Sequence, residues 1–167
     1  RPVSLPPREL PVRAYVGGGG LYETADSQRS LDDLRRLARE LGVEGRVGFT
    51  GYVEDAAAAM RALDVVVHAS TEPEPFGLVI VEAMACGRAV VASEAGGAAE
   101  LIRARVDALG HAPGDAAQLA RCIAELAEDG ELRTRLGAEG GAAAERRFDR
   151  ARLAAELVPI YRAAAES

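Results

Sequence analysis

The sequence predicts an α/β fold, a Rossmann-like parallel sheet with helices on both faces. Short apolar runs alternate with segments of about ten residues in which apolar side chains recur at helical spacing, and this alternation indicates βα units. Aromatic residues make up only 4% of the chain and Trp is absent, so Ala, Val, Leu and Ile must build the core, which suits helices packed on a parallel sheet. The length of 167 residues fits one domain. We expect about five or six parallel strands in one sheet.

The first half of the chain shows the start and stop signals of these units. Four prolines among residues 1–11 favour a linker or a truncated domain boundary, and we place the domain at residues 12–167. A helix with leucines at helical spacing ends at Gly42, and Asp55 is positioned to cap the next helix. Three valines before His68 are typical of a buried strand. The predicted elements are strands at residues 12–16, 46–50 and 64–68 and helices at residues 31–41 and 55–62.

The second half continues the alternation and ends in helices. A proline-rich turn at residues 72–75 precedes a helix that Gly87 stops, and a strand follows at once. From Asp115 onward the pattern is helical, and the last helix carries an apolar stripe. The predicted elements are helices at residues 77–86 and 100–103, and strands at residues 89–92 and, on the sheet edge, 109–112. Helix breaks are predicted near Gly130, Gly137, Gly140–Gly141 and Asp149, and the apolar stripe within residues 148–165 consists of Leu153, Leu157, Ile160 and Tyr161.

Charge and reactive side chains exclude several classes of protein. A net charge of -6 argues against general nucleic-acid binding, which needs a basic face. Two cysteines and two histidines are too few for a disulfide framework or for a zinc or iron site, so we expect no metal and no cofactor. No signal peptide and no apolar run of about 18 residues stand in the sequence. These features predict a cytoplasmic protein.

The segment at residues 74–87 carries the most information about function. Two carboxylates, Glu74 and Glu82, lie eight positions apart across a predicted helix N-terminus. Gly77 lets a ligand approach the backbone, and the free amides of the first helical turn favour an anion. Glu82 lies about 7.5 Å along the helix axis, which is similar to the reach from a diphosphate to a ribose. The helix N-terminus can therefore hold a diphosphate, while the two carboxylates accept hydrogen bonds from sugar and ribose hydroxyls.

This segment resembles the E-x7-E motif of the retaining glycosyltransferases of family 4, group 1, which have the two-domain GT-B architecture. The resemblance covers nearly the whole chain and rests on an ordered series of short matches. Besides the motif, the matching segments are residues 49–53, 64–70, 90–93, 96–97, 113–115 and 132–133. The turn at residues 103–107 departs from the family pattern, because it lacks the usual glycine. The resemblance implies the C-terminal half of a GT-B enzyme, which binds a nucleoside-diphosphate sugar without a metal and passes a hexose to an unknown acceptor.

The resemblance also implies roles for individual residues. Glu74 would hold the donor sugar and act as the catalytic residue, and Glu82 would bind the ribose. The remaining contacts would come from Phe76, Gly77 and Leu78 to the sugar and phosphates through their amides, from Val53 to the nucleobase with Asp55 nearby, and from Gly18 and Gly19 at the mouth of the site.

Two parts of such an enzyme are expected outside this chain. The family carries an Arg and a Lys before the first strand, where they neutralise the donor diphosphate, and this chain starts after that segment. The acceptor-binding N-terminal domain is also expected to be missing, so the chain alone should not turn over sugar. In the family the last helix crosses to that domain. We therefore expect the apolar stripe to be exposed or covered by a second copy of the chain, and the complete protein to be cytoplasmic or peripheral to a membrane.

Other interpretations of the same residues stay open. A nucleotide-binding or interaction module that never transfers sugar is the main alternative. A nicotinamide-dependent oxidoreductase would need a glycine where Tyr22 stands, and a glycoside hydrolase would need both glutamates to flank one sugar. Glu82 can also be a solvated helix residue, although its apolar neighbours make a charge there costly, and Glu74 an ordinary turn residue. The simplest interpretation of His68 is a structural residue whose hydrogen bonds are satisfied. His111 is interpreted as a loop residue, and Arg146–Arg147 as part of a solvated helix face.

Overall fold

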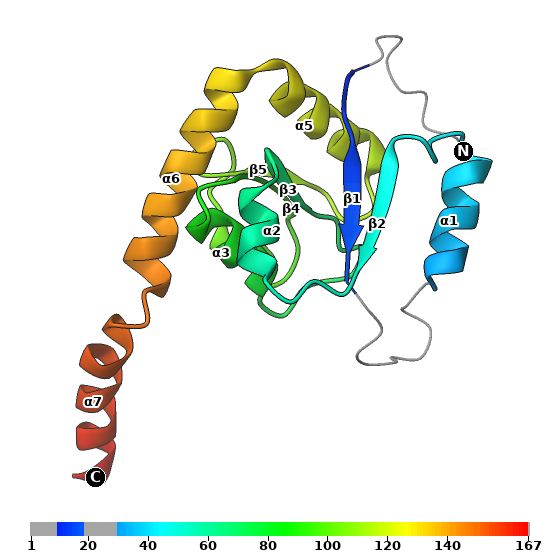
Figure 1. Cartoon of the computed structure of the whole chain (residues 1–167). Helices are drawn as coiled ribbons and strands as arrows, with labels where there is room; N and C mark the ends of the chain where they lie inside the picture. Colours follow the sequence, from blue (N-terminus) through cyan, green and yellow to red (C-terminus); the bar gives the residue numbers. More distant parts are fainter. Residues whose placement is uncertain (1–9, 19–29, 167) are drawn as a thin grey trace. The chain divides into compact units, whose positions relative to one another are not determined.

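The structure, a computed structural model, describes residues 10–18 and 30–166 (Figure 1). The chain divides into two compact units, which are described one at a time. The small unit covers residues 6–59 and the large unit begins at Met60. Of the predicted linker, only Leu10 and Pro11 lie within the described residues, and both are outside helices and strands.

Two parallel strands and one helix form the regular structure described in the small unit. β1 (Ala14–Gly17) pairs with β2 (Val47–Gly51) in parallel, and α1 (Leu31–Glu40) lies between them in the sequence. The Arg46 guanidinium donates to the carbonyl oxygen of Leu10, which ties β2 to the segment that enters β1. The predicted strands and helix are therefore confirmed within one or two residues at each end.

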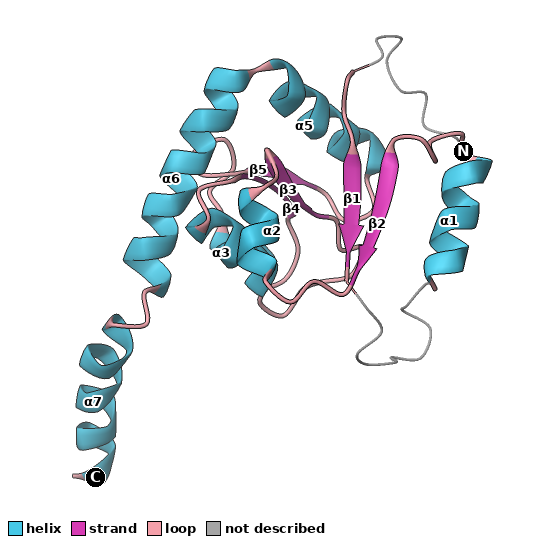
Figure 2. Cartoon of the chain, viewed as in Figure 1, coloured by secondary structure: helices cyan, strands magenta, loops and turns pink. Residues whose placement is uncertain are grey.

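Three parallel strands in the order β3–β4–β5 form the sheet of the large unit (Figure 2). The register pairs Val66 with Val90 and Val91 with Leu109, and β5 is an edge strand as predicted. The α/β class with parallel strands is confirmed, although the described strands form two separate ladders instead of a single sheet. The elements are β3 (Val65–His68), α3 (Leu78–Ala85), β4 (Ala89–Ser93), α4 (Ala98–Leu101), β5 (Leu109–His111), α5 (Ala116–Glu128), α6 (Gly130–Phe148) and α7 (Arg152–Ala165), and α2 (Ala56–Arg61) spans the boundary between the units.

The central strand β4 is covered by helices on both of its faces. Side chains alternate along a strand, so Val90 points to one face and Val91 to the other. Val90 joins a cluster with Ile80 of α3 and with residues of α4 and α6. Val91 joins a second cluster with Leu126 of α5 and Leu136 of α6. The predicted helices on both faces of the sheet are therefore present in the large unit.

The predicted breaks at Gly137 and Gly140–Gly141 are wrong, because α6 runs through all three glycines. A Cβ at Gly137 would lie 2.5 Å from the carbonyl oxygen of Gly87, and one at Gly140 would lie 3.1 Å from that of Asp107. These glycines therefore allow α6 to approach the neighbouring backbone closely and do not end the helix. The predicted boundary near Gly130 is confirmed, since Asp129 caps α6 by accepting a hydrogen bond from the Leu132 amide at 2.8 Å.

The short helix predicted at residues 100–103 is shifted, because the chain beyond α4 forms a tight turn. The Asp107 side chain is fully buried and accepts hydrogen bonds from the amide and the Nε of Arg103, at 2.6 and 2.9 Å. Arg105 has a φ of 64°, the left-handed conformation that glycine usually supplies. The turn thus keeps a glycine-like backbone without a glycine, and Asp107 is the residue that holds it.

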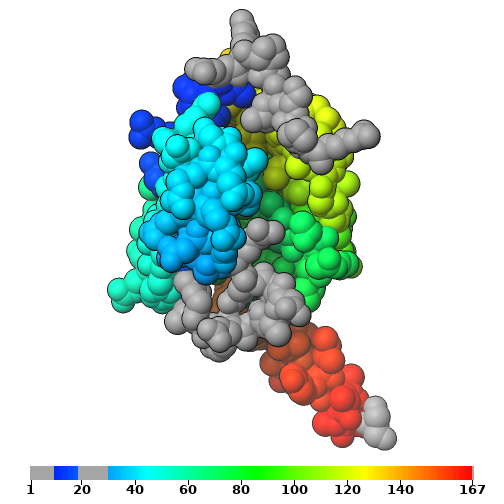
Figure 3. All heavy atoms as spheres, turned by 90° about the vertical axis from the view of Figure 1, so that its right-hand side faces the viewer, coloured from blue at the N-terminus to red at the C-terminus, as the bar shows by residue number. Residues whose placement is uncertain are grey.

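The last helix, α7, buries none of its residues (Figure 3). The predicted stripe is exposed along its length, from Leu153 at 56% exposure to Tyr161 at 71%. The exposure predicted for this stripe is therefore confirmed. Among the described residues, no helix combines the length and the apolar character that a membrane span requires.

Candidate functional site

The predicted anion site at the N-terminus of α3 has a backbone that only glycine adopts without strain. Gly77 is the N-cap and has a φ of 96°, and a Cβ there would lie 3.0 Å from Cδ1 of Ile80. As at every helix start, the first amides of α3 have no partner inside the helix, and Leu78, which carries one of them, is exposed. We call residues 74–78 the α3 tip. Its free amides and the helix dipole together attract an anion.

Glu74 is held at the α3 tip by its backbone. Its carbonyl oxygen accepts a hydrogen bond from the Gly97 amide at 2.8 Å, and it forms a parallel bridge with Gly96. A Cβ at Gly96 would lie 2.6 Å from the same oxygen, so a glycine is needed there. The Cγ of Glu74 comes within 3.5 Å of the position that a Gly77 Cβ would take. The side chain therefore stands beside the first amides of α3, and it is about one-third exposed.

Phe76 connects the α3 tip to the end of α6. Its ring meets the ring of Phe148 edge to face, with centroids 6.1 Å apart, and 43% of Phe76 is exposed. Arg147 lies over the Phe148 ring at 4.8 Å and donates to the carbonyl oxygens of Glu100 and Leu101 at 2.7 and 2.6 Å. The end of α6 is thus fastened both to the aromatic residue of the tip and to the last carbonyls of α4.

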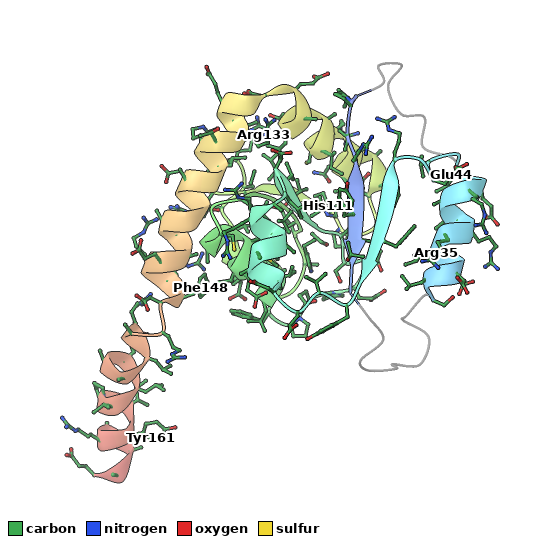
Figure 4. The ribbon with its side chains drawn as sticks, viewed as in Figure 1. Arg35, Glu44, His111, Arg133, Phe148 and Tyr161 are labelled. Atoms are coloured by element: carbon green, nitrogen blue, oxygen red, sulfur yellow. The ribbon has the colours of Figure 1, made fainter. Side chains whose placement is uncertain are left out.

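Two histidines lie buried at the ends of the strands next to the α3 tip. His68 closes β3, and its Nε2 is 3.8 Å from Oε2 of Glu74. His111 closes β5 (labelled in Figure 4), with Nε2 3.2 Å from the His68 carbonyl oxygen and Nδ1 2.9 Å from that of Ala112. Nδ1 of His68 and the hydroxyl of Ser93 are buried without a hydrogen-bond partner among the described residues. Polar groups thus gather at the carboxyl edge of the sheet, where open α/β sheets bind ligands.

Glu82 lies on the exposed side of α3. Within the part of the chain that the structure describes, no hydrogen bond or ion pair engages its carboxylate. Its apolar neighbours Ala83 and Met84 face the core instead. The argument that these neighbours make a charge costly is therefore wrong, because Glu82 remains solvated. A free carboxylate five residues into the helix still suits a ribose diol, and this role stays a prediction.

The other predicted site residues belong to the small unit. Asp55 caps α2 as predicted, since its Oδ1 accepts from the Ala58 amide at 2.7 Å. Gly18 has a φ of 137°, and its amide donates to the Gly51 carbonyl at 2.9 Å. Val53 follows β2 and is half-buried. Gly19 lies outside the described residues. In the described chain, no group of three or more His, Cys, Asp and Glu side chains is arranged to hold a metal ion.

Comparison with known proteins decides the family. The sequence profile of the family described as "Glycosyl transferases group 1" matches residues 10–142. The chain belongs to this family. The match contains both the α3 tip and the β1–β2 pair, so the two units are covered by one family profile.

Relatives of this group 1 glycosyltransferase chain are known by sequence and by structure. The lipopolysaccharide core biosynthesis glycosyltransferase LpsE of Rhizobium meliloti is 39% identical over 76% of this chain and 37% of its own length. The phosphatidyl-myo-inositol mannosyltransferase of Mycobacterium leprae is 38% identical over 89% of this chain and 41% of its own. The crystal structure of Anabaena Alr3699/HepE in complex with UDP-glucose superposes with a TM-score of 0.83 and 37% identity, covering 95% of this chain and 42% of that protein. The chain spans about two fifths of the length of these relatives.

Sequence reasoning described three residues near the α3 tip incompletely or wrongly. Arg147 is exposed, as the predicted solvated helix face implies, but its guanidinium also donates to the last carbonyls of α4, which the prediction did not include. The prediction of a loop residue is wrong for His111, which lies in β5 and is 2% exposed. His68 is buried as predicted, but one of its ring nitrogens is not satisfied. The available signal was position: His68 ends the strand predicted at residues 64–68, and His111 is the second-last residue of the strand predicted at 109–112, at the sheet edge where ligands bind.

Proposed function

We propose that this chain is the C-terminal, donor-binding domain of a retaining, metal-independent glycosyltransferase of family 4 with an E-x7-E motif. The enzyme would move a hexose from a nucleoside-diphosphate sugar to an acceptor bound elsewhere. The observation that carries the proposal is the α3 tip, in which Gly77 frees the first amides of a helix and Glu74 stands beside them. In a nucleotide sugar the phosphate and the sugar are adjacent groups of one ligand. The amides can bind the phosphate, and the Glu74 carboxylate beside them can bind the sugar.

The α3 tip can lower the barrier by stabilising the leaving group. The amides of Phe76, Gly77 and Leu78 would donate to the diphosphate, whose charge grows as the glycosidic bond breaks. Glu74 would accept hydrogen bonds from the sugar hydroxyls, and Glu82 from the ribose. No metal is needed for this charge stabilisation, because the helix dipole and the amides supply it. The domain thus contributes positioning and electrostatic stabilisation to the transfer.

Two observations support an acceptor-binding domain outside this chain. The chain spans about two fifths of the length of its curated relatives, which leaves room for a second domain of similar size. The stripe on α7, including Leu157 and Ile160, is exposed at 37% and 62%. An apolar helix face of this kind is normally covered by a partner surface. We assign that cover to the acceptor-binding domain, with self-association of this chain as the other outcome of a size measurement.

Titration of the chain followed by NMR tests donor binding. Three pairs of ligands are added in turn, each a nucleoside diphosphate and its nucleotide sugar: UDP and UDP-glucose, GDP and GDP-mannose, and ADP and ADP-glucose. We expect one pair to bind with a Kd in the high micromolar to millimolar range, about -4 to -6 kcal/mol, and to shift the amides of the α3 tip. Binding should stay weak, because the resemblance implies an Arg and a Lys at the diphosphate and this sequence contains no Lys. If none of the six ligands shifted the tip amides, the proposal would fail.

A matched pair of glycine variants locates the bound nucleotide. Gly77→Ala forces a Cβ against Ile80 at a φ of 96° and should abolish binding. Gly87→Ala has a similar strain, with a φ of 67° and no atom within 4 Å, but Gly87 follows the other end of α3, so this variant should leave binding unchanged. For the complete enzyme, the anomeric configuration of the product, read by NMR, tests the retaining mechanism. Donor binding with no transfer to any acceptor would identify a binding module instead.

A further inference from the structure

His68 combines burial, a carboxylate neighbour and an unsatisfied ring nitrogen. The residue is 9% exposed, and its Nε2 lies 3.8 Å from Oε2 of Glu74. Its Nδ1 is buried with no hydrogen-bond partner among the described residues. Buried polar atoms nearly always have a partner, so such an exception calls for an explanation. The packing of the core does not require a histidine at position 68, because a valine or leucine would fill the end of a buried strand equally well.

Both ends of this contact are fixed through their backbones. His68 pairs with Ala92 of β4, and its carbonyl oxygen lies 3.2 Å from Nε2 of the buried His111. Glu74 is held by the hydrogen bond from the Gly97 amide. The imidazole and the carboxylate therefore face each other from two rigid segments. This arrangement can set the direction of a side chain without touching the ligand itself.

We propose that His68 is a positioning residue, which turns the Glu74 carboxylate toward the sugar of the bound donor. The inference rests on the proposed function, because that function gives the sugar to Glu74. Among the described residues only Nε2 has an acceptor nearby, so we place the ring proton on Nε2, where it points at Oε2. Oε1 is then free to accept hydrogen bonds from the sugar hydroxyls. A gap of 3.8 Å is longer than a hydrogen bond. The proposal requires this contact to shorten when the donor binds, as contacts at catalytic sites often do.

Two amide variants of His68 separate positioning from packing. The side-chain nitrogen of His68→Gln reaches about as far as Nε2, whereas that of His68→Asn stops near the place of Nδ1. Each variant is titrated with the nucleoside diphosphate and the nucleotide sugar that bind the wild-type chain best among the six probes. The quantity compared is the preference for the sugar-bearing ligand, the ratio of the two Kd values. Thermal unfolding of each variant measures the structural effect separately.

We expect His68→Asn to reduce this preference about ten-fold, the scale of one charge-assisted hydrogen bond, and to leave the affinity for the bare diphosphate unchanged. His68→Gln should keep the preference within about two-fold of wild type. In a Glu74→Gln background, His68→Asn should have no further effect, because it acts through the lost carboxylate. An unchanged preference in His68→Asn, an equal loss in both variants, or additive effects with Glu74→Gln would each overturn the proposal.

The wild-type chain supplies a test that does not depend on the folding of a variant. A long-range ¹H–¹⁵N spectrum of the imidazole reports which nitrogen carries the proton. We expect the proton on Nε2, and we expect the Nε2 signal to move on addition of the nucleotide sugar but not of the diphosphate alone. A proton on Nδ1, or no response to the sugar, would overturn the positioning role. If the wild-type chain bound the diphosphate and the sugar-bearing ligand equally, the assignment of Glu74 in the proposed function would fail instead.

Discussion

The ring of Phe76 at the α3 tip rests edge-on against the ring of Phe148, the last residue of α6 (Phe148 is labelled in Figure 4). Phe148 is partly buried and packs against the core cluster that contains Val90. Phe148→Ala should lower the free energy of unfolding by about 1–3 kcal/mol through lost burial and the lost aromatic pair. It should also weaken nucleotide binding, because Phe76 loses its support. Tyr161→Ala is the control, since Tyr161 is 71% exposed and should change neither quantity. Chemical denaturation and NMR titration measure both.

The two glutamates of the motif should differ in the kinetic constant that they affect. Glu82 is proposed to bind the ribose, which is unchanged between ground and transition states, so Glu82→Gln should mainly raise KM. We expect a loss of about 1.5–3 kcal/mol in kcat/KM. Glu74 is proposed to hold the reacting sugar, so Glu74→Gln should cost at least as much, largely in kcat. Steady-state kinetics of the complete enzyme, with the donor varied at saturating acceptor, separate the two. Wild-type kcat and KM in both variants would show that the carboxylates are ordinary surface charge.

Two neighbouring glycines of α6 should respond in opposite directions to the same substitution. Gly137→Ala places a Cβ 2.5 Å from the Gly87 carbonyl oxygen, so α6 must move and stability should fall by about 2 kcal/mol or more. Gly141→Ala places its Cβ 3.5 Å from the Met84 carbonyl oxygen, an ordinary contact, and should gain up to about 1 kcal/mol of helix propensity. Urea denaturation compares the two. Equal effects would contradict the close approach of α6 to the loop at Gly87.

The buried carboxylate of Asp107 should contribute more to the free energy of unfolding than a nearby exposed ion pair does. Asp107→Ala removes the acceptor of two hydrogen bonds from Arg103 in a fully buried position. We expect a loss of about 2–3 kcal/mol in the free energy of unfolding, below the value for a fully buried pair because Arg103 is 58% exposed. Glu125→Gln, which breaks the exposed ion pair with Arg105, should have little effect. A Glu125 variant as damaging as the Asp107 variant would contradict this ranking.

The thiol of Cys122 should make the large unit less stable in alkaline solution. Burial raises the pKa of Cys122 above its ordinary value, and the neighbouring Glu125 carboxylate raises the pKa further. Below the ordinary pKa of about 8.5 the thiol is neutral in both states. As the pH rises past that value, the unfolded chain ionises first, so the folded state loses stability. We expect the stability of Cys122→Ala to fall less than that of wild type between about pH 8 and 10, as measured by denaturation at each pH. Parallel curves would refute the raised pKa.

Local signals in the sequence were enough for most elements of the fold. The valine run before His68 and the alanine–valine run after Gly87 identified β3 and β4, because buried parallel strands are apolar on both faces. The α3 helix was identified by its flanking glycines. The breaks predicted at Gly137 and Gly140–Gly141 were wrong, whereas the role predicted for Gly77 matches the backbone that the structure shows. A glycine reports that space or conformational freedom is needed, and only the neighbours tell which.

The sequence by itself determined the α/β class, the helix N-terminus after β3 and the two carboxylates of the motif, since each depends on residues close together in the chain. Tertiary structure decided which other side chains reach that N-terminus. His68 faces Glu74 because β3 and the loop before α3 meet at the same edge of the sheet, and the Gly97 amide, 23 residues after Glu74, holds that loop in place. Phe148 lies against Phe76 because α6 packs along α3. Contacts across such separations depend on how helices and strands pack, which periodicity along one segment does not specify.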